Sequence, residues 1–255
     1  MSVDEARPNI SRIYDYVLGG HNNFEVDRQA AERILQVFPA YPRWAKLNRW
    51  FLQLVAEQWK QQGYTHILDL GSGIPTQGHL HSILTDAQIL YTDNDPIAVA
   101  YARELLNKVP NVNFEQIDAR EPDAILSHAD QFFTGERKVA IGCIGIAYLI
   151  DDIKLGHLVQ MLHNWSAPGT VMAMTIPASN TGLDDTSDIV SIFKRQNVEI
   201  FMRSEEQIRS ITNPWRVVEF KPLTEWLNTT HLMQESDYMS VGSDFYGILF
   251  EHSGT

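Results

Sequence analysis

Hydrophobic residues recur with two different spacings along the chain, and the change comes close to residue 63. Before that point they return every three or four positions, which is typical of one face of a helix. The two clearest helical segments are "DRQAAERILQVF" (27–38) and "NRWFLQLVAEQWKQQG" (48–63). Gly63 suits the residue that follows a helix end. Between the two segments, "FPAYPRW" (38–44) carries two prolines and is predicted to be a turn.

After residue 63, short β-rich runs alternate with helical segments. Five strands, each followed by helical sequence, are predicted at 65–70, 87–95, 111–118, 137–145 and 169–177. Such units in series predict a parallel sheet with helices on both faces and right-handed crossovers. The last part of the chain is less regular. Helices are predicted there at 186–196 and 204–211, strands at 215–223 and 245–253, and a long loop at 224–243.

Length, charge and cysteine content narrow the class of protein. The 255 residues fit one α/β domain with additions, or at most two small domains. The chain has 20 Lys and Arg against 32 Asp and Glu, a net charge of -12, which disfavours binding to nucleic acids and to anionic membranes. A single cysteine, Cys143, excludes a disulfide within the chain and favours a reducing, cytoplasmic environment. The longest apolar run, residues 139–150, is too short to cross a bilayer.

The first predicted strand ends in a turn with two glycines, "LDLGSGIPT" (68–76), at the place where open parallel sheets bind ligands. Gly71 and Gly73 would let the backbone approach a ligand closely. Asp93 ends the second strand, where a carboxylate commonly accepts hydrogen bonds from both hydroxyls of a ribose. Asp118 ends the third strand and is placed to bind an adenine amino group. Turn geometry and helix capping also explain such residues one at a time, but three acids at three successive strand ends favour a nucleoside site.

Two classes of nucleoside ligand remain open at this turn. A dinucleotide fold uses G-x-G-x-x-G, in which the third glycine brings a helix N-terminus to the pyrophosphate. Here Thr76 takes the place of that glycine, and Pro75 offers no backbone N–H. S-adenosylmethionine has no phosphate and needs a close backbone approach plus acids for its ribose and adenine. The spacing fits it better, and a nucleotide-dependent oxidoreductase is the less favoured reading.

Several segments carry a family resemblance: "ILDLGSG", "YTDNDP" and "QIDARE", then "SRIYDYVLGGHNNFEVDRQAAE", "GSGIPTQGHLH", "PLTEW" and "YGILF". The first three resemble the motifs of class I S-adenosylmethionine-dependent methyltransferases. The others resemble the S-adenosyl methyltransferase family common in actinobacteria, once catalogued as a domain of unknown function. The resemblance covers nearly the whole chain. Many relatives carry Lys-Asp-Asn-Phe where this chain has His21-Asn22-Asn23-Phe24. The charge of this loop is therefore changed, and we expect the change to affect the choice of substrate more than the binding of the cofactor.

The resemblance implies an α/β, Rossmann-like seven-stranded methyltransferase fold, mostly parallel, with an antiparallel last strand and a helical N-terminal extension. Residues 1–62 would form this extension as a lid over the cofactor, and residues 63–255 the class I methyltransferase domain. The implied cofactor is S-adenosyl-L-methionine. The residues implied to bind it are Tyr14, Gly20, His21, Asn22, Asp69, Gly71, Ser72, Gly73, Pro75, Thr76, Asp93, Asn94, Asp118, Ala119 and Arg120.

Methyl transfer depends mainly on aligning the acceptor and excluding water, and a base matters only for an alcohol, phenol or protonated amine. His21 is the first candidate for a catalytic base, followed by Tyr148 and His231. No metal site is expected, because there is no H-E-x-x-H motif or cysteine pair, and His79 and His81 would point apart on a helix.

The predicted function is methylation of a small-molecule acceptor at oxygen, nitrogen or carbon, with secondary metabolism as one setting. The alternative is a protein that binds S-adenosylmethionine or S-adenosylhomocysteine without transferring a methyl group. The sequence separates these two functions poorly, because both need the three strand-end acids. No nucleic-acid or membrane partner is expected, and a homodimer is left open.

Overall fold

The computed structural model describes residues 7–75, 78–179, 187–196, 198–237 and 243–254. Its strands form one seven-stranded sheet. The strands are β1 (His66–Leu70), β2 (Gln88–Asp93), β3 (Val112–Gln116), β4 (Ala140–Cys143), β5 (Val171–Ser179), β6 (Arg216–Pro222) and β7 (Ser243–Glu251).

The strand order is β3-β2-β1-β4-β5-β7-β6. Strands β1 to β5 pair in parallel, and β7 runs antiparallel between β5 and β6. The described residues of β4 are all buried, as is typical of a strand covered on both faces. The predicted methyltransferase fold, mostly parallel with an antiparallel last strand, is therefore confirmed.

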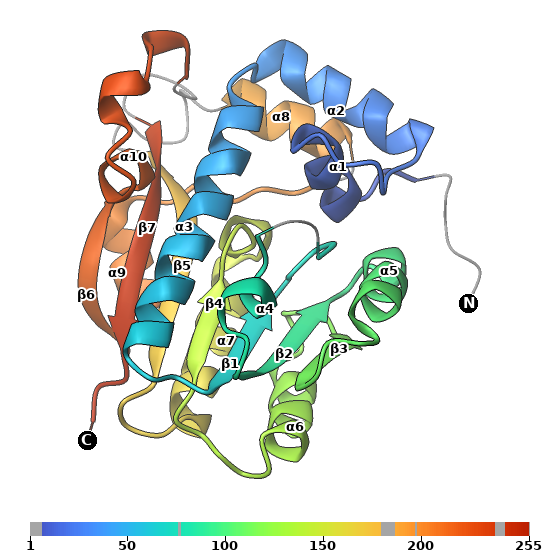
Figure 1. Ribbon diagram of the computed structural model, residues 1–255. Helices are drawn as coiled ribbons and strands as arrows, with labels where there is room; N and C mark the ends of the chain where they lie inside the picture. The colour runs from blue at the N-terminus through green and yellow to red at the C-terminus, as the bar shows by residue number, and fades with distance from the viewer. Residues whose placement is uncertain (1–6, 76–77, 180–186, 197, 238–242, 255) are drawn as a thin grey trace.

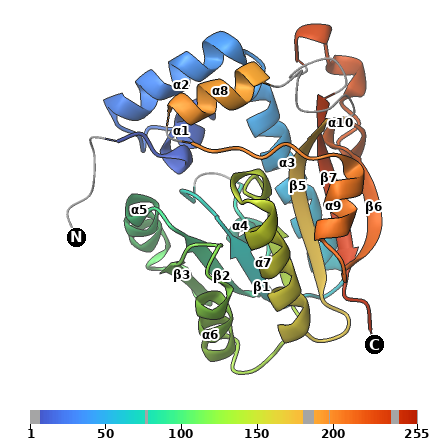
Figure 2. The same cartoon turned by 180° about the vertical axis from the view of Figure 1, so that it is seen from behind.

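Helices cover both faces of the sheet and also its carboxyl edge. Helices α3 and α4 lie on one face (Figure 1), and α6, α7 and α9 lie on the other (Figure 2). Helices α1, α2 and α8 lie together beyond one end of the sheet. The helices are α1 (Ile10–Val17), α2 (Glu25–Val37), α3 (Tyr41–Gln61), α4 (Leu80–Ile83), α5 (Pro96–Leu106), α6 (Pro122–Phe132), α7 (Asp152–Trp165), α8 (Ser187–Arg195), α9 (Glu205–Ile211) and α10 (Leu223–Trp226).

The predicted turn at 38–44 is wrong in its second half, because α3 already begins at Tyr41. Pro42 lies in the first turn of this helix, where its missing N–H has no intrahelical partner to lose. The long loop predicted at 224–243 is also partly helical. It contains most of α10 and two short 3₁₀ helices, η3 (Thr230–Leu232) and η4 (Glu235–Asp237).

The N-terminal helices share one buried core with the sheet domain. Trp44 of α3 stacks on Phe245 of β7 with ring centroids 5.2 Å apart, and Phe51 packs against Trp226 at 5.4 Å. The predicted division of the chain at residue 62 therefore stays a prediction, since α3 packs as part of the core. What matters for the site is that α3 extends from this core to the carboxyl edge of the sheet, where α1 also lies.

Candidate active site

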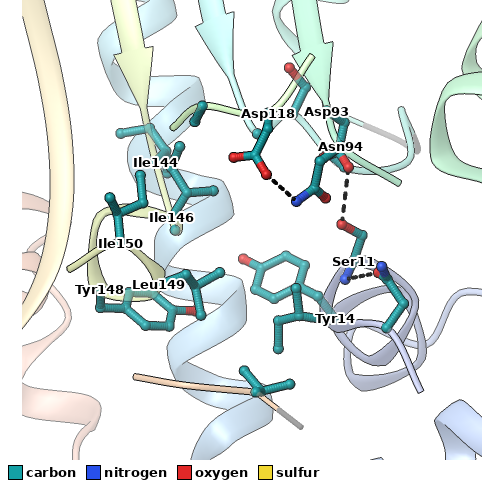
Figure 3. Close-up of a pocket in the computed structure, with 18 of the residues that line it drawn as sticks. Ser11, Tyr14, Asp93, Asn94, Asp118, Ile144, Ile146, Tyr148, Leu149 and Ile150 are labelled. Atoms are coloured by element: carbon teal, nitrogen blue, oxygen red, sulfur yellow. Dashed lines mark hydrogen bonds between the residues drawn. The ribbon is translucent and has the colours of Figure 1, made fainter. Parts of the chain in front are cut away.

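A cavity of about 470 Å³ lies at the carboxyl edge of the sheet (Figure 3). One side is formed by lining residues of the segments 69–74, 93–94 and 117–120, at or just after the carboxyl ends of β1, β2 and β3; we call it the sheet wall. Lining residues of 8–18 and 48–52, from α1 and α3, form what we call the helical wall. Segments 144–154 and 198–201 complete the cavity.

The glycine turn of the sheet wall needs both of its glycines, for partly different reasons. Gly71 and Gly73 have φ angles of 60° and 65°, in the left-handed region that side chains disfavour. A Cβ on Gly71 would lie 2.4 Å from the Cγ2 methyl group of Ile146, whereas a Cβ on Gly73 would meet no atom of the described residues within 4 Å. The turn therefore leaves open space beside Gly73, as a closely approaching ligand requires.

Asp93 holds the turn to the neighbouring strand and to α1. Its Oδ2 accepts a hydrogen bond from the N–H of Gly73 at 2.8 Å, and its Oδ1 accepts from the N–H of Asp95 at 2.8 Å. The hydroxyl of Ser11 in α1 also donates to Oδ1, at 3.5 Å (Figure 3). Burial raises the pKa of Asp93 to about 6, despite the hydrogen bonds that lower it.

Asp118 follows β3 and is held by two neighbours. Its carboxylate accepts hydrogen bonds from Asn94 Nδ2 at 3.3 Å and from Arg120 Nε at 2.8 Å (Figure 3 shows the first). Partial burial would raise the pKa of Asp118, but the hydrogen bonds from Arg120 and Asn94 outweigh it and lower the pKa to about 2. This carboxylate is therefore ionised at neutral pH.

Asp69 lies at the base of the glycine turn and is 3% exposed. Its Oδ1 packs against Gly142 of β4, where a Cβ would come within 2.3 Å. Burial raises the pKa of Asp69 to about 7, against the opposing effects of Ser72 and Arg49. The group can therefore change its protonation state near neutral pH.

Two tyrosines reach the cavity from different elements (Figure 3). Tyr14 of α1 donates its hydroxyl hydrogen to the carbonyl of Ala45 at 2.8 Å, and burial raises its pKa to about 12. Tyr148 lies in the 3₁₀ helix η1 (Ala147–Leu149), and burial raises its pKa as well. Both hydroxyls are therefore protonated at neutral pH.

The helical wall contains buried polar atoms without a hydrogen-bond partner. Among the described residues, Oδ1 of Asp15, Oδ1 of Asn48 and Nε of Arg49 all lack one, and all three residues line the cavity. Asp15 and Asn48 are 5% and 2% exposed. Leaving such atoms unpaired costs stability, so those of Asn48 and Arg49 mark a surface that a ligand would complete, whereas Oδ1 of Asp15 lies against Gly20, behind the cavity.

Most of the residues predicted to bind the cofactor line this cavity. They are Tyr14, Asp69, Gly71, Ser72, Gly73, Asp93, Asn94, Asp118, Ala119 and Arg120, and the predicted catalytic residue Tyr148 lines it too. Pro75 lies beside it without lining it, and Thr76 lies outside the described residues. His231 is exposed in η3, away from the lining.

The cavity is not lined by Gly20, His21 or Asn22. These residues lie behind Asp15, which does line it. The N–H of Asn22 donates to Asp15 Oδ2 at 2.8 Å, and a Cβ on Gly20 would lie 2.2 Å from Asp15 Oδ1. The side chain of His21 is exposed. The predicted roles of these three residues, including His21 as a base, stay predictions.

The sequence reasoning missed Ser11, Asp15, Asn48 and Arg49. A signal existed for Asn48, which lies on the buried stripe of α3 four residues after Trp44. A polar residue in such a stripe needs a partner, and that need is what singles it out.

The two histidines expected to point apart do not. Only four residues of α4 are helical, His79 precedes them, and the rings of His79 and His81 lie nearly parallel with centroids 6.2 Å apart. Even so, the described part of the chain holds no group of three His, Cys, Asp or Glu side chains that could bind a metal ion. Nor does any helix in that part combine the length and hydropathy needed to cross a membrane.

The family model for S-adenosyl methyltransferases matches residues 1–243. The chain belongs to this family. It is therefore an S-adenosylmethionine-dependent methyltransferase, as its fold and strand-end acids led us to expect. A search of curated protein sequences finds no match to it.

Solved structures agree with the family assignment. A proposed methyltransferase from Thermobifida fusca is similar with 28% identity and a TM-score of 0.85, covering 98% of this chain and 97% of that one. A DUF574 family protein from Streptomyces avermitilis is similar with 23% identity and a TM-score of 0.86, covering 99% and 100%. Human N-acetylserotonin methyltransferase, solved with S-adenosylmethionine, shares the fold with 16% identity and a TM-score of 0.52, covering 98% and 64%.

The residues present suit the cofactor of this methyltransferase. An additional ligand would fill the open space beside Gly73 and would give hydrogen-bond partners to the unpartnered atoms of Asn48 and Arg49. The strand order places the ends of β3, β2 and β1 side by side, so Asp118, Asp93 and Asp69 follow one another along the sheet wall. They would face adenine, ribose and the methionyl part in turn.

Proposed function

We propose that this methyltransferase acts on a small-molecule acceptor that binds in the same cavity as the cofactor. The observation that carries the proposal is the cavity itself, whose volume of about 470 Å³ lies in the range of about 300–1,000 Å³ typical of small-molecule sites. Apolar side chains line it away from the strand-end acids, among them Leu18, Leu52 and Phe201. They favour an acceptor with an apolar or aromatic part.

The charge of the cavity also favours a small molecule over nucleic acid. Its lining contains six acidic and three basic side chains among the described residues, and the whole chain has a net charge of -12. A phosphate backbone would be repelled by such a surface, whereas a neutral or cationic acceptor would not.

The protein's part in the reaction would be alignment and exclusion of water. S-adenosylmethionine supplies a methyl carbon that its bond to a positively charged sulfur already activates. Holding the acceptor in line with that carbon can contribute about 7–11 kcal/mol. We propose that the protonated Tyr148 hydroxyl orients the acceptor and that residues 1–62 act as a lid, since α1 and α3 contribute lining residues.

Two measurements test this function. Calorimetry with S-adenosylmethionine, S-adenosylhomocysteine and NAD should show binding of the first two and none of the third. Incubation with methyl-labelled cofactor and a cell extract should then place label in the low-mass fraction. The Asp93→Ala variant should abolish this labelling, and Lys46→Gln, at an exposed position of α3, should not.

Label found only in the protein or nucleic-acid fraction would contradict the proposed acceptor class. Binding of the cofactor with no transfer to any fraction would favour the non-methylating alternative.

A further inference from the structure

Arg49 of α3 lines the cavity, and no acidic side chain among the described residues forms an ion pair with it. Its Nε is buried and unpartnered, and its Nη1 lies 2.9 Å from Nε2 of His79. None of the ion pairs formed within the described ranges includes Arg49. A guanidinium group has five N–H donors in a planar fork, so most of its capacity is unused here.

The other two cations of the lining differ from Arg49 in this respect. Arg120 forms an ion pair with Asp118, and Lys154 pairs with Asp151 at 3.2 Å. Among the described residues, the side chain within hydrogen-bond distance of Arg49 is the ring of His79, whose pKa burial and the nearby guanidinium hold well below its usual value. His79 is therefore neutral, and the charge of Arg49 is not balanced by it.

The position of Arg49 points to one end of the cofactor. Its partner His79 also contacts the carbonyl of Ile74 at 3.0 Å, and Gln53, one turn further along α3, approaches the carbonyl of Gly78 at 3.5 Å. Arg49 therefore lies over the glycine turn that follows β1. Its charge also lowers the pKa of Asp69, which ends the series of acids from Asp118 through Asp93.

We propose that Arg49 binds the carboxylate of the methionyl part of S-adenosylmethionine, an inference that rests on the cofactor site proposed above. With adenine at Asp118 and ribose at Asp93, the amino-acid part extends past the end of β1, which is where Arg49 stands. A guanidinium fork matches a carboxylate in a bidentate geometry, and the partly buried site strengthens the interaction. Arg49 is thus a binding residue for the cofactor's anionic group.

The test compares a ligand that has the carboxylate with one that lacks it. S-adenosylhomocysteine carries the amino-acid tail with its amino and carboxylate groups, and 5′-methylthioadenosine keeps the adenosyl thioether but has a methyl group in place of that tail. Calorimetry should show that Arg49→Gln weakens S-adenosylhomocysteine binding by about 10- to 100-fold, as expected for a charge-assisted hydrogen bond. Binding of 5′-methylthioadenosine should stay within about 2-fold, because the lost group contacts only the carboxylate.

Two further variants complete the comparison. Arg49→Lys should restore part of the affinity, because it keeps the charge but loses the fork. Lys46→Gln removes an exposed positive charge from the same helix and should change neither affinity.

Three outcomes would overturn the inference. Unchanged S-adenosylhomocysteine affinity in Arg49→Gln would show that the carboxylate binds elsewhere, while leaving the proposed function intact. Equal weakening of both ligands would show that Arg49 only supports the fold of the turn. If the unmodified protein bound neither ligand, the cofactor site itself would be wrong, and the inference would fail with it.

Discussion

On the sheet wall, the carboxylates of Asp93 and Asp118 already accept hydrogen bonds from neighbouring residues. On the helical wall, Asn48 and Arg49 keep buried polar atoms that find no partner among the described residues. The first wall is thus fixed by its own bonds before any ligand arrives. The second is complete only when a ligand supplies the missing partners, so its stability should depend more strongly on binding.

The largest effect on stability is expected from the ion pairs that join α1, part of the helical wall, to the segment that follows β2. Arg12 of α1 is 3% exposed and forms ion pairs with Asp27 at 2.7 Å and Asp95 at 3.4 Å, both of them buried. Arg12→Met would leave two buried acids without their cation, which should lower the free energy of unfolding by about 3–5 kcal/mol. Chemical denaturation measures this loss.

Arg216→Gln is the matched control, because Arg216 forms an exposed pair with Glu251. It should cost no more than about 1 kcal/mol. Equal losses in the two variants would mean that the Arg12 cluster does not hold α1 to the sheet.

Substitution of the two glycines of the sheet wall should have a somewhat smaller effect on stability, and the effect should differ between them. Gly71→Ala should cost about 1–2 kcal/mol for the left-handed backbone and about 1–3 kcal/mol more for the contact with Ile146. Gly73→Ala should cost only the backbone part in stability, since its Cβ meets no atom of the described part of the chain. It should nevertheless weaken S-adenosylhomocysteine binding, because its methyl group would occupy the open space. Denaturation and calorimetry of both variants would show whether that space belongs to a ligand.

The two walls also differ in how far the sequence predicts them. The carboxyl ends of parallel strands meet at one edge, so the approach of Asp69, Asp93 and Asp118 follows from their places at strand ends. The helical wall depends on how α1 and α3 pack on that edge. Hydrophobic periodicity predicts which face of a helix is buried, but not which part of the protein that face packs against. The place of Arg49 in the cavity could therefore not be predicted from the sequence. The start of α3 was missed for a local reason, since Pro42 is compatible with a first helical turn.

The charge of the sheet wall predicts a pH dependence of binding. In the proposed cofactor site an ionised Asp93 would accept hydrogen bonds from the ribose hydroxyls, and burial raises its pKa in the free protein to about 6. Affinity for S-adenosylhomocysteine should therefore be full above this value and fall as the pH drops through it, by about 10-fold near pH 5. Calorimetry between pH 5 and 8 measures the profile.

Asp69, with a pKa of about 7, adds its own pH dependence to the same profile. The Asp93→Asn variant should bind S-adenosylhomocysteine more weakly at pH 8. Its affinity should no longer fall near pH 6, while the fall caused by Asp69 should remain. An unchanged profile in this variant would assign the whole fall to other groups.

The smallest effect is expected at His21, which belongs to neither wall. Its side chain is exposed, whereas its neighbours Gly20, Asn22 and Asn23 contact Asp15. His21→Ala should therefore change the free energy of unfolding by no more than about 0.5 kcal/mol and leave S-adenosylhomocysteine affinity within about 2-fold. Gly20→Ala is the informative neighbour, because its Cβ would displace the Asp15 carboxylate and should weaken binding. A turnover assay of His21→Ala with an identified acceptor then tests the remaining role: a fall in kcat at unchanged cofactor affinity would support His21 as the base, and an unchanged kcat would exclude it.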